Sequence, residues 1–352
     1  MEIDIFKKFY QEQVTKLNKV ISDYNDNLVK NKSHYLFDNL KLFANLNSDG
    51  KLIRGILISL GYKMTGAKDI DYSLSLSLAY EIFQTSVLIH DDIIDNDNLR
   101  RGKETIHFAN KRKYEKYGDA RKVAESIGIC MGDYGFYDAN KIIVKNYAKD
   151  KNLAKILEYY NDIVLKTIEG ELIDVTLPFE SKYNLLTSDL DTEIMSIYRL
   201  KTAYYTIIGP LCLGMILGDA TSKRLQDITK IGESIGIAFQ IQDDILGIYN
   251  DMGKVIGTDI KEFKQTVLYS YTYNSSYKNE LLKYYGKDDL SDESITAVRK
   301  IFKESGAYDY AINLMNKLYD SASTEINKLK WLTEEDRDIL LGFVNYLKMR
   351  KK

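Results

Sequence analysis

Two short runs of aspartates are the residues whose type and spacing could do chemistry. Asp91, Asp92 and Asp95 form the first run, and Asp243 with Asp244 forms the second. Residues four apart on a helix project from one face, so Asp91 and Asp95 would present two carboxylates together. Each run follows an apolar stretch, and unpaired carboxylates buried beside such a stretch are costly. We therefore expect a cation at these residues.

Magnesium is the cation that suits such a site best. Mg²⁺ takes oxygen ligands, keeps several waters and is usually held by one or two carboxylates together with substrate phosphates. Two helices that present acids to one cavity would hold several ions, and such ions imply an anionic substrate. The alternative for either run alone is that its acids form a solvated helix face or a helix end.

Basic side chains near the two runs are candidates to bind the anionic substrate. Arginine suits bidentate capture of phosphate, whereas lysine acts as a compact point charge. Two arginines follow the first run, two lysines follow the second, and a lysine and an arginine lie three apart near the N-terminus. These residues are Arg100, Arg101, Lys254, Lys264, Lys51 and Arg54. Taken singly, each is more typical of a solvated surface.

The elements that position these groups are expected to be helices. Proline removes an intrahelical hydrogen bond and clashes with the preceding turn, and the 352 residues include only 2 prolines. Apolar residues recur at helical spacing, as at Ile295, Val298 and Phe302. Thr333, three residues before Asp336, predicts the start of the last helix. The sequence therefore predicts an all-α protein.

The segment 69–95 is expected to be one long helix because it lacks turn signals, although Leu74, Leu76 and Leu78 alternate as they would in a strand. The first aspartate run would then extend from a buried helix. Breaks between helices are single glycines, and no linker rich in glycine, serine or proline occurs. This pattern favours one domain over 1–352.

The composition limits the classes of protein. The chain carries 49 Lys and Arg against 51 Asp and Glu, and 45% of its residues are hydrophobic. These values are typical of a soluble globular protein, and the near-neutral charge argues against nucleic acid as a partner. Cys130 and Cys212 are interpreted as two buried thiols in a reducing compartment. A signal-peptide pattern is absent, so we expect a cytoplasmic protein. The uncharged segment 202–218 approaches the length of a membrane span, but we expect a buried core helix instead.

These motifs together resemble those of the trans-isoprenyl diphosphate synthases, the family of the farnesyl, geranylgeranyl and longer polyprenyl diphosphate synthases. The resemblance extends from Gly50 to Arg350. It is strongest in LIHDDIIDNDNLRRG at 88–102 and FQIQDDILG at 239–247, which are similar to the first and second aspartate-rich motifs. The sequence RLKTA at 199–203 lies between them.

The resemblance implies an isoprenoid-synthase-type bundle of helices around a deep central cavity, working as a homodimer. It also implies three Mg²⁺ ions and two substrates, isopentenyl diphosphate and an allylic diphosphate. The implied metal ligands are Asp91, Asp95 and Asp243, supported by Asp92 and Asp244. The residues implied for the allylic diphosphate are Arg100, Lys201 and Lys254, and Lys264 is counted among the substrate-binding residues. Those implied for isopentenyl diphosphate are Lys51, Arg54, Gln84 and Arg101, with Arg350 closing over it.

The chemistry that this resemblance implies agrees with the residues present. Loss of diphosphate from an allylic carbon leaves a carbocation beside a highly charged leaving group. Preorganised metal ions and cationic side chains stabilise the charge that develops on the leaving group. The double bond of isopentenyl diphosphate then attacks, and the released diphosphate removes the proton. No catalytic histidine is needed, and Lys201, Thr202 and Gln240 are the candidate catalytic residues, the last two with oxygen dipoles near the carbocation.

Three departures from the family pattern bear on the site. Gly55 stands where proline is common, and Glu171 stands where glutamine is usual and adds a negative charge. Gly247 replaces the last acid of the second motif. Active relatives also carry this glycine, so we still expect catalysis.

Two other functions remain open at this point. A class I terpene cyclase also ionises an allylic diphosphate with Mg²⁺, but it has no isopentenyl site, so Lys51, Arg54 and Arg101 argue against it. A non-catalytic partner subunit of a heteromeric synthase usually loses its metal ligands, whereas Asp91 and Asp95 are both present.

Product length in this family depends on where a bulky side chain stops the growing tail below the first aspartate run. One turn down that helix stand Ser86 and Val87, which are not aromatic, so a farnesyl-length stop is not expected there. Phe83 and Tyr80 lie further down the same side of that helix. They are the next candidates for the floor, meaning the bulky side chain that stops the growing tail, unless they are ordinary core residues. We expect geranylgeranyl diphosphate or a somewhat longer product.

Overall fold

The structure is a computed structural model and describes residues 2–30, 32–48, 50–249, 257–287 and 291–350. The described residues are mainly α-helical and include one sheet, a hairpin of two short strands. The all-α prediction is confirmed. The chain folds into two compact units, and the single domain predicted over 1–352 stays a prediction.

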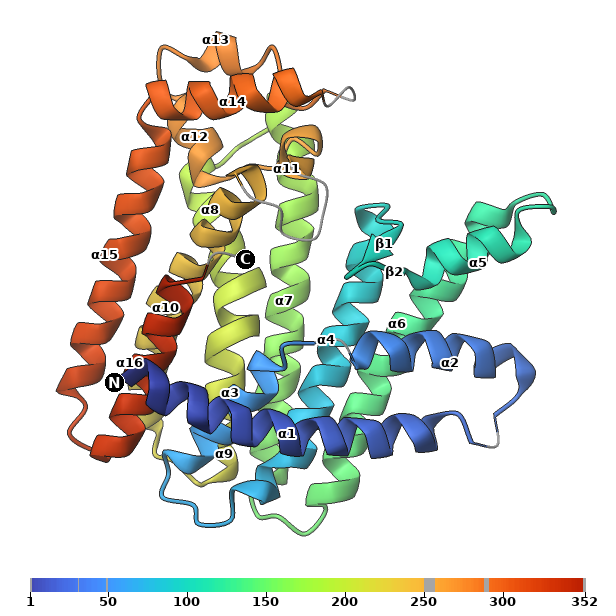
Figure 1. Ribbon diagram of the computed structural model, residues 1–352, viewed down its shortest axis with the longest axis vertical. Helices are drawn as coiled ribbons and strands as arrows, with labels where there is room; N and C mark the ends of the chain where they lie inside the picture. The colour runs from blue at the N-terminus through green and yellow to red at the C-terminus, as the bar shows by residue number, and fades with distance from the viewer. Residues whose placement is uncertain (1, 31, 49, 250–256, 288–290, 351–352) are drawn as a thin grey trace. The chain divides into compact units, whose positions relative to one another are not determined.

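Unit 2 consists of Lys8–Glu158 and Pro210–Ala220. Its helices pack around fully buried aromatic side chains, among them Phe43, Tyr80 and Phe83, and α4 and α6 lie side by side (Figure 1). Its elements, of which α1 and α9 extend past its boundary, are α1 (Glu2–Leu28), α2 (His34–Asn47), α3 (Ile53–Lys63), η1 (Ile70–Ser73), α4 (Leu74–Ile94), β1 (Leu99–Arg100), β2 (Lys103–Glu104), α5 (Ile106–Tyr114), α6 (Ala120–Tyr147) and α9 (Gly209–Leu217).

Unit 1 consists of Met1–Lys7, Tyr159–Gly209 and Thr221–Lys352. Its core includes Phe302, Tyr319 and Phe343, which are all fully buried. Its elements, of which α7 begins in unit 2, are α7 (Leu153–Lys182), α8 (Leu190–Ile197), η2 (Tyr198–Ile208), α10 (Ser222–Tyr249), α11 (Thr258–Lys261), α12 (Val267–Tyr273), α13 (Lys278–Leu281), α14 (Asp292–Glu304), α15 (Ala307–Lys328) and α16 (Glu334–Lys348).

The helix α4, which carries the first aspartate run, is buried on almost every side. A short 3₁₀ turn, η1, precedes it, so the helix predicted over 69–95 starts in a tighter turn and becomes α-helical at Leu74. The alternating leucines are therefore not a strand. Because a helix that is buried all round carries apolar residues on every face, alternation along it has no structural meaning.

The hairpin after α4 places two arginines at its turn. Leu99 pairs with Glu104 and Arg100 with Lys103, which leaves Arg101 and Gly102 as the two turn residues. Both have positive φ, 54° and 77°, as the turns that suit a two-residue hairpin require. Arg100 and Arg101 therefore follow the aspartates on a tight and locally determined turn.

The uncharged segment belongs to one helical run, Leu190–Leu217, made of α8, η2 and α9. Its central part, η2, is a π-helix, a rare form that occurs frequently at functional sites. By length and mean hydropathy this run is the one stretch of the described chain that would suit a membrane, yet 83% of its most apolar window is buried. This burial agrees with the core helix that we predicted. Cys212 on this run is buried, as expected, but Cys130 lies on the exposed side of α6, so the prediction of two buried thiols is wrong for Cys130.

The N-terminus of α16 follows the sequence prediction. The Thr333 hydroxyl accepts a hydrogen bond from the Asp336 backbone N–H at 3.1 Å and donates one to the Asp336 carboxylate at 2.7 Å. Such a cap satisfies a backbone donor that has no partner within the helix. The predicted start of this last helix is confirmed.

Candidate functional site

The first aspartate run lies at the C-terminal end of α4, in unit 2. Asp92 is buried, with 1% of its surface exposed, whereas Asp91 and Asp95 are half-buried. The run therefore divides between two faces, as its spacing predicts. Because a helix C-terminus carries the negative end of the helix dipole, the carboxylates at this end attract cations strongly.

The guanidinium of Arg100 neutralises part of this run. It donates hydrogen bonds to Asp92 and, at 2.8 Å, to Asp91, and it lies 3.6 Å from a carboxylate oxygen of Asp97. Burial raises the pKa of Asp92 to about 7, although Arg100 acts in the opposite direction. Arg100, which we assigned to a diphosphate, thus holds the aspartates together in this structure.

Two of the cations predicted for isopentenyl diphosphate lie close to one another in unit 2. A Cβ atom added to Gly50 would lie 3.7 Å from Nη1 of Arg101, so this arginine borders the segment before α3. Glu81 of α4 is buried, and burial raises its pKa, while the charges of both Arg54 and Arg101 lower it. The positive charges of both arginines therefore act on one buried carboxyl group.

The other two residues of that predicted set flank the same region. Lys51 lies two residues before α3, and its backbone carbonyl accepts a hydrogen bond of 2.7 Å from the Tyr10 hydroxyl. Gln84 lies on α4 and is half-buried. Because residues three apart on a helix are neighbours, Gln84 lies on the side of α4 that also carries Glu81.

The second aspartate run lies on α10, in unit 1, and its first member is paired with the end of the chain. Asp243 is 31% exposed and forms an ion pair with Arg350. The Arg350 guanidinium also lies 4.5 Å from the centre of the Phe239 ring, and the Arg350 carbonyl accepts a hydrogen bond from Gln242. Arg350, predicted to close over isopentenyl diphosphate, lies on the Asp243 carboxylate in this structure.

Asp244, by contrast, is almost fully buried and belongs to a hydrogen-bonded chain. It accepts hydrogen bonds from the Tyr198 hydroxyl and, at 2.8 Å, from the Gln240 amide, and the Thr202 hydroxyl donates to Gln240. Burial raises the pKa of Asp244 to about 7, and the neighbouring charge of Asp259 adds to the rise. The structure thus brings the two predicted dipoles, Thr202 and Gln240, together beside an aspartate.

Lys201, on the π-helix η2, lies between two acids of α7. Its ammonium is 2.7 Å from Glu171 and 2.6 Å from Asp174. These acids are three residues apart and therefore share a face of the helix. The unusual negative charge of Glu171 is thus located beside the lysine that we assigned to the allylic diphosphate.

The missing acid of the second motif has a neighbour that the sequence does not indicate. A Cβ atom added to Gly247 would lie 3.0 Å from a carboxylate oxygen of Asp259, on α11. Lys264 lies 3.9 Å from the same residue and 3.7 Å from Glu262. Lys254 lies outside the residues that the structure describes. The carboxylate of Asp259 therefore approaches the position of the missing last acid of the second motif.

The carboxylates fit a Mg²⁺ ion that is shared with a substrate. Oδ2 of Asp92 is buried and has no hydrogen-bond partner among the described residues. No group of three or more His, Cys, Asp or Glu side chains within the described ranges could hold a metal on its own. Because Mg²⁺ is usually bound by one or two carboxylates, with waters and substrate phosphates as the other ligands, a pair of aspartates is sufficient.

A family model described as polyprenyl synthetase matches residues 40–303. The chain belongs to the polyprenyl synthetase family. It is 29% identical over 312 residues to a short chain isoprenyl diphosphate synthase of Methanocaldococcus jannaschii, covering 87% of this chain and 85% of that protein. It is 27% identical over 335 residues to a geranylgeranyl diphosphate synthase of Sulfolobus acidocaldarius, covering 92% of each.

Solved structures share the fold of this polyprenyl synthetase. The geranylgeranyl pyrophosphate synthase of Corynebacterium glutamicum, complexed with isoprenyl diphosphate and magnesium, matches with a TM-score of 0.86 at 24% identity, over 98% of this chain and 99% of that one. The polyprenyl synthase of Caulobacter crescentus, complexed with calcium and isoprenyl diphosphate, matches with a TM-score of 0.77 at 20% identity, over 99% and 98%. The predicted isoprenoid-synthase fold is confirmed.

The residues predicted to limit the product of this polyprenyl synthetase are mostly buried. Tyr80, Phe83 and Ser86 have no exposed surface, and Val87 is half-buried. The Phe83 ring lies 5.3 Å from that of Tyr80 and 5.6 Å from that of Phe136 on α6, measured between ring centres. The candidate floor therefore joins α4 to α6.

Ser86 faces a neighbouring helix. A Cβ atom added to Gly135 of α6 would lie only 2.0 Å from the Ser86 hydroxyl oxygen, so the two helices approach closely at this level. The Ser86 hydroxyl donates to the Ile82 carbonyl at 3.0 Å. A larger side chain at Ser86 would therefore contact α6 directly.

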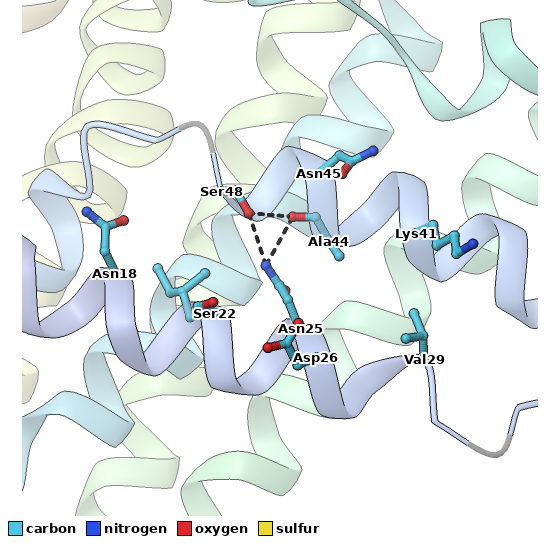
Figure 2. A pocket seen from close by; sticks show the side chains of 10 residues that line it. Asn18, Ser22, Asn25, Asp26, Val29, Lys41, Ala44, Asn45 and Ser48 are labelled. Atoms are coloured by element: carbon cyan, nitrogen blue, oxygen red, sulfur yellow. Dashed lines mark hydrogen bonds between the residues drawn. The ribbon is translucent and has the colours of Figure 1, made fainter.

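A pocket of about 590 Å³ opens elsewhere in unit 2, between α1 and α2 (Figure 2). Its lining is mixed, and its polar residues include Asn18, Ser22, Asn25, Asp26 and Lys41. The Asn25 amide donates to the Ala44 carbonyl and to the Ser48 hydroxyl across it. None of the predicted site residues lines this pocket.

Three residues of this polyprenyl synthetase site were missed from sequence: Tyr198, Glu81 and Asp259. Tyr198 stands one helical turn before Thr202, and that spacing could have indicated it. The other two offer no such signal, because their contacts join separate helices.

Proposed function

We propose that this protein is a trans-isoprenyl diphosphate synthase that condenses isopentenyl diphosphate with an allylic diphosphate. The observation that carries the proposal is the family match over 40–303, which includes Asp91, Asp92 and Asp95 of the first run and Asp243 and Asp244 of the second. The relatives named as geranylgeranyl, geranylfarnesyl and short chain isoprenyl diphosphate synthases support it. The protein is accordingly a prenyltransferase.

In this function the two aspartate runs bind the diphosphate of the allylic substrate through divalent cations. The proposed ligands are Asp91, Asp95 and Asp243, and the ions are Mg²⁺, three in number. A bound divalent cation stabilises the negative charge that develops on the leaving diphosphate. The oxygen-only chemistry of these side chains and the partnerless Asp92 oxygen support the assignment.

The residues of this chain then orient the reacting carbons. Lys201, Arg100 and Lys264 bind allylic phosphate oxygens, and Lys254 is proposed with them. Thr202 and Gln240, which are hydrogen-bonded to one another, direct oxygen dipoles at the developing carbocation. Asp244 keeps Gln240 in place by accepting its amide hydrogen bond.

Isopentenyl diphosphate binds at the start of α3. The cations proposed for it are Lys51, Arg54 and Arg101, with Gln84 beside them and Arg350 closing over it. The diphosphate released from the allylic substrate takes the proton from the condensed intermediate, so no side chain acts as a general base. The product is geranylgeranyl diphosphate or a somewhat longer chain.

A homodimer is part of the proposal. Five exposed apolar side chains recur at spacings of three and four on one face of α7, namely Leu165, Ile168, Leu172, Val175 and Phe179, each at least 45% exposed. Soluble monomers rarely expose a continuous apolar patch of this kind. A second copy of the chain is the proposed cover. We further propose a cytoplasmic location and neither a nucleic-acid partner nor a membrane span.

One assay tests the function and its two alternatives. Purified protein is incubated with labelled isopentenyl diphosphate, an allylic primer and Mg²⁺, and the extracted products are separated by chromatography. A synthase incorporates label into a longer prenyl diphosphate. Conversion of the primer to an unlabelled hydrocarbon would instead indicate a terpene cyclase. If the protein shows no turnover by itself but activity appears when another synthase subunit is added, the protein is a non-catalytic partner.

A further inference from the structure

Two side chains of α4 hold both backbone polar groups of Gly55. The Gly55 N–H donates a hydrogen bond to Oε1 of Glu81, and the Ser77 hydroxyl donates one to the Gly55 carbonyl; each bond is 2.7 Å long. Ser77 and Glu81 are four residues apart and therefore share one face of the helix. Both are buried, Glu81 with 5% of its surface exposed. We refer to these two residues as the Gly55 clamp.

The clamp replaces the cap that α3 lacks. Gly55 is the third residue of α3, and the first backbone N–H groups of a helix have no partner within it. The usual partner is a side chain just before the helix. Here that residue is Leu52, which makes no side-chain cap hydrogen bond and has a left-handed backbone with φ of 54°. Glu81 thus supplies from α4 the acceptor that α3 does not have.

A side chain at position 55 would be crowded in the observed packing. A Cβ atom added at position 55 would lie 2.6 Å from Leu17 and 3.2 Å from Oε1 of Glu81. Proline, which the family pattern has at this position, has no backbone N–H and could not donate a hydrogen bond to Glu81. The departure at Gly55 and the buried acid at Glu81 therefore belong to one arrangement.

The clamped turn carries the cations of the isopentenyl diphosphate site. Lys51 and Arg54 stand on either side of Leu52, and Tyr10 fixes the Lys51 carbonyl. A left-handed conformation at a non-glycine residue persists only when its surroundings hold it. The contacts at Gly55 and Lys51 hold this segment at both ends. Release of Gly55 would let the first turn of α3 relax and would displace both cations.

We propose that Glu81 is a positioning residue for isopentenyl diphosphate, acting through its hydrogen bond to Gly55 on the orientation of Lys51 and Arg54. This inference rests on the proposed function, because it takes these two cations to bind that substrate. Glu81 itself does not contact the substrate. It needs only an acceptor oxygen to act, so glutamine is expected to replace it and leucine is not.

The test compares Glu81→Leu with Glu81→Gln in steady-state kinetics with each substrate varied in turn. Glu81→Leu is expected to raise the Michaelis constant for isopentenyl diphosphate at least tenfold, with less than a threefold change for the primer. Glu81→Gln is expected to stay within threefold of wild type for both. Ser77→Ala should give a smaller rise for isopentenyl diphosphate, because the Gly55 carbonyl can still accept a helical bond.

Thr85→Val is the matched control, and Arg54→Ala reports on the site itself. Thr85 is buried one turn further along α4 and bonds to Asn47 instead of Gly55. The Thr85→Val substitution is expected to lower the melting temperature without changing either Michaelis constant. If Arg54→Ala selectively raises the constant for isopentenyl diphosphate while Glu81→Leu does not, the positioning role of Glu81 is overturned and the proposed function stands.

Two further results separate a wrong site from a wrong role. An Arg54→Ala effect confined to the primer would mean that the diphosphate sites are exchanged, and the present inference would fail with that assignment. Where Glu81→Leu does not fold, a tenfold rise in Glu81→Ala, again reversed in Glu81→Gln, would support the role. Equal effects on both substrates in every clamp variant would show a general structural contribution and contradict the inference.

Discussion

The ammonium group of Lys201 lies 2.7 Å from the carboxylate of Glu171. Asp174 lies 2.6 Å from the same ammonium group, so two negative charges face one positive charge before any diphosphate binds. A diphosphate must compete with both acids for Lys201. The extra acid at position 171 therefore weakens the proposed allylic site.

Removing that charge should strengthen the binding of the primer. Glu171→Gln keeps the size of the side chain and leaves Asp174 to hold Lys201. Unit charges several ångströms apart near a protein surface interact by roughly 1–4 kcal/mol, and screening by solvent reduces this value. We expect the Michaelis constant for the allylic diphosphate to fall roughly three- to tenfold. Glu169→Gln, an exposed acid on the same helix, is the control, and an equal fall there would contradict the local explanation.

Loss of either proposed metal-binding aspartate should abolish most of the activity. Asp91→Ala and Asp243→Ala each remove a carboxylate that would hold a cation against the leaving diphosphate. Loss of one oxyanion-stabilising donor costs roughly 10²- to 10³-fold in rate, and loss of a metal ligand should cost at least as much. The measurement is the turnover number at saturating Mg²⁺ and both substrates.

The matched control for these variants is Asp162→Ala, which removes an exposed acid of α7. It should leave turnover unchanged. Mn²⁺ binding followed by electron paramagnetic resonance gives a readout that does not depend on activity, and it should weaken in both site variants. Near-normal turnover in either of them would overturn the metal assignment.

The features that could be predicted from the sequence are those set by local spacing. The helices, the Thr333 cap and the buried segment 202–218 all follow from periodicity or from residues within one turn of each other. Contacts between distant segments could not be predicted in this way. Glu81 with Gly55 and Asp259 with Gly247 are pairs that only the packing of separate helices brings together.

The same distinction explains why the ion-pair partners of the predicted cationic side chains could not be predicted from the sequence. Arg100, Lys201 and Arg350 were identified from motif positions, which indicate a role but not a contact. In the structure each is paired with a carboxylate of its own unit. Paired charges are what burial requires of such residues, and in the proposed function they exchange these partners for phosphate when the substrate binds.

The apolar face of α7 should be necessary for dimer formation. Leu172 is 62% exposed in the middle of this face, and Leu172→Glu would bury a charge in the proposed interface. We expect light scattering after size exclusion to give twice the chain mass for wild type and the chain mass for the variant. Glu304→Lys, which changes an exposed acid on α14, should remain dimeric. A dimeric Leu172→Glu protein would place the interface on another surface.

Stability should depend on pH through Glu81. Burial raises the pKa of this group above 4.5, against the opposing effects of the Gly55 N–H, Arg54 and Arg101. The folded state then binds more protons than the unfolded state above pH 4.5, so the stability contributed by this group falls as pH rises from that value through the raised pKa. Urea midpoints measured between about pH 4.5 and 8 should fall relative to those of Glu81→Gln. A constant difference between the two proteins would contradict this prediction.

The last prediction concerns the length of the product, which depends on the contact between Phe83 and Phe136. Both rings meet where α4 and α6 pack together, below the first aspartate run, and Phe83 has no exposed surface. If this contact closes the path of the growing chain, Phe83→Ala opens it and the product gains at least one isoprene unit. If Phe83 is ordinary core, the variant only loses stability, by roughly 3–5 kcal/mol for a buried Phe→Ala change.

Phe83→Leu, which leaves a smaller cavity, keeps the test usable where the alanine variant unfolds, and Phe136→Ala probes the other side of the contact. Chromatography of the dephosphorylated products separates the two cases: longer chains from Phe83→Ala and Phe136→Ala alike would identify the floor, whereas an unchanged distribution in folded variants would place it on a different helix.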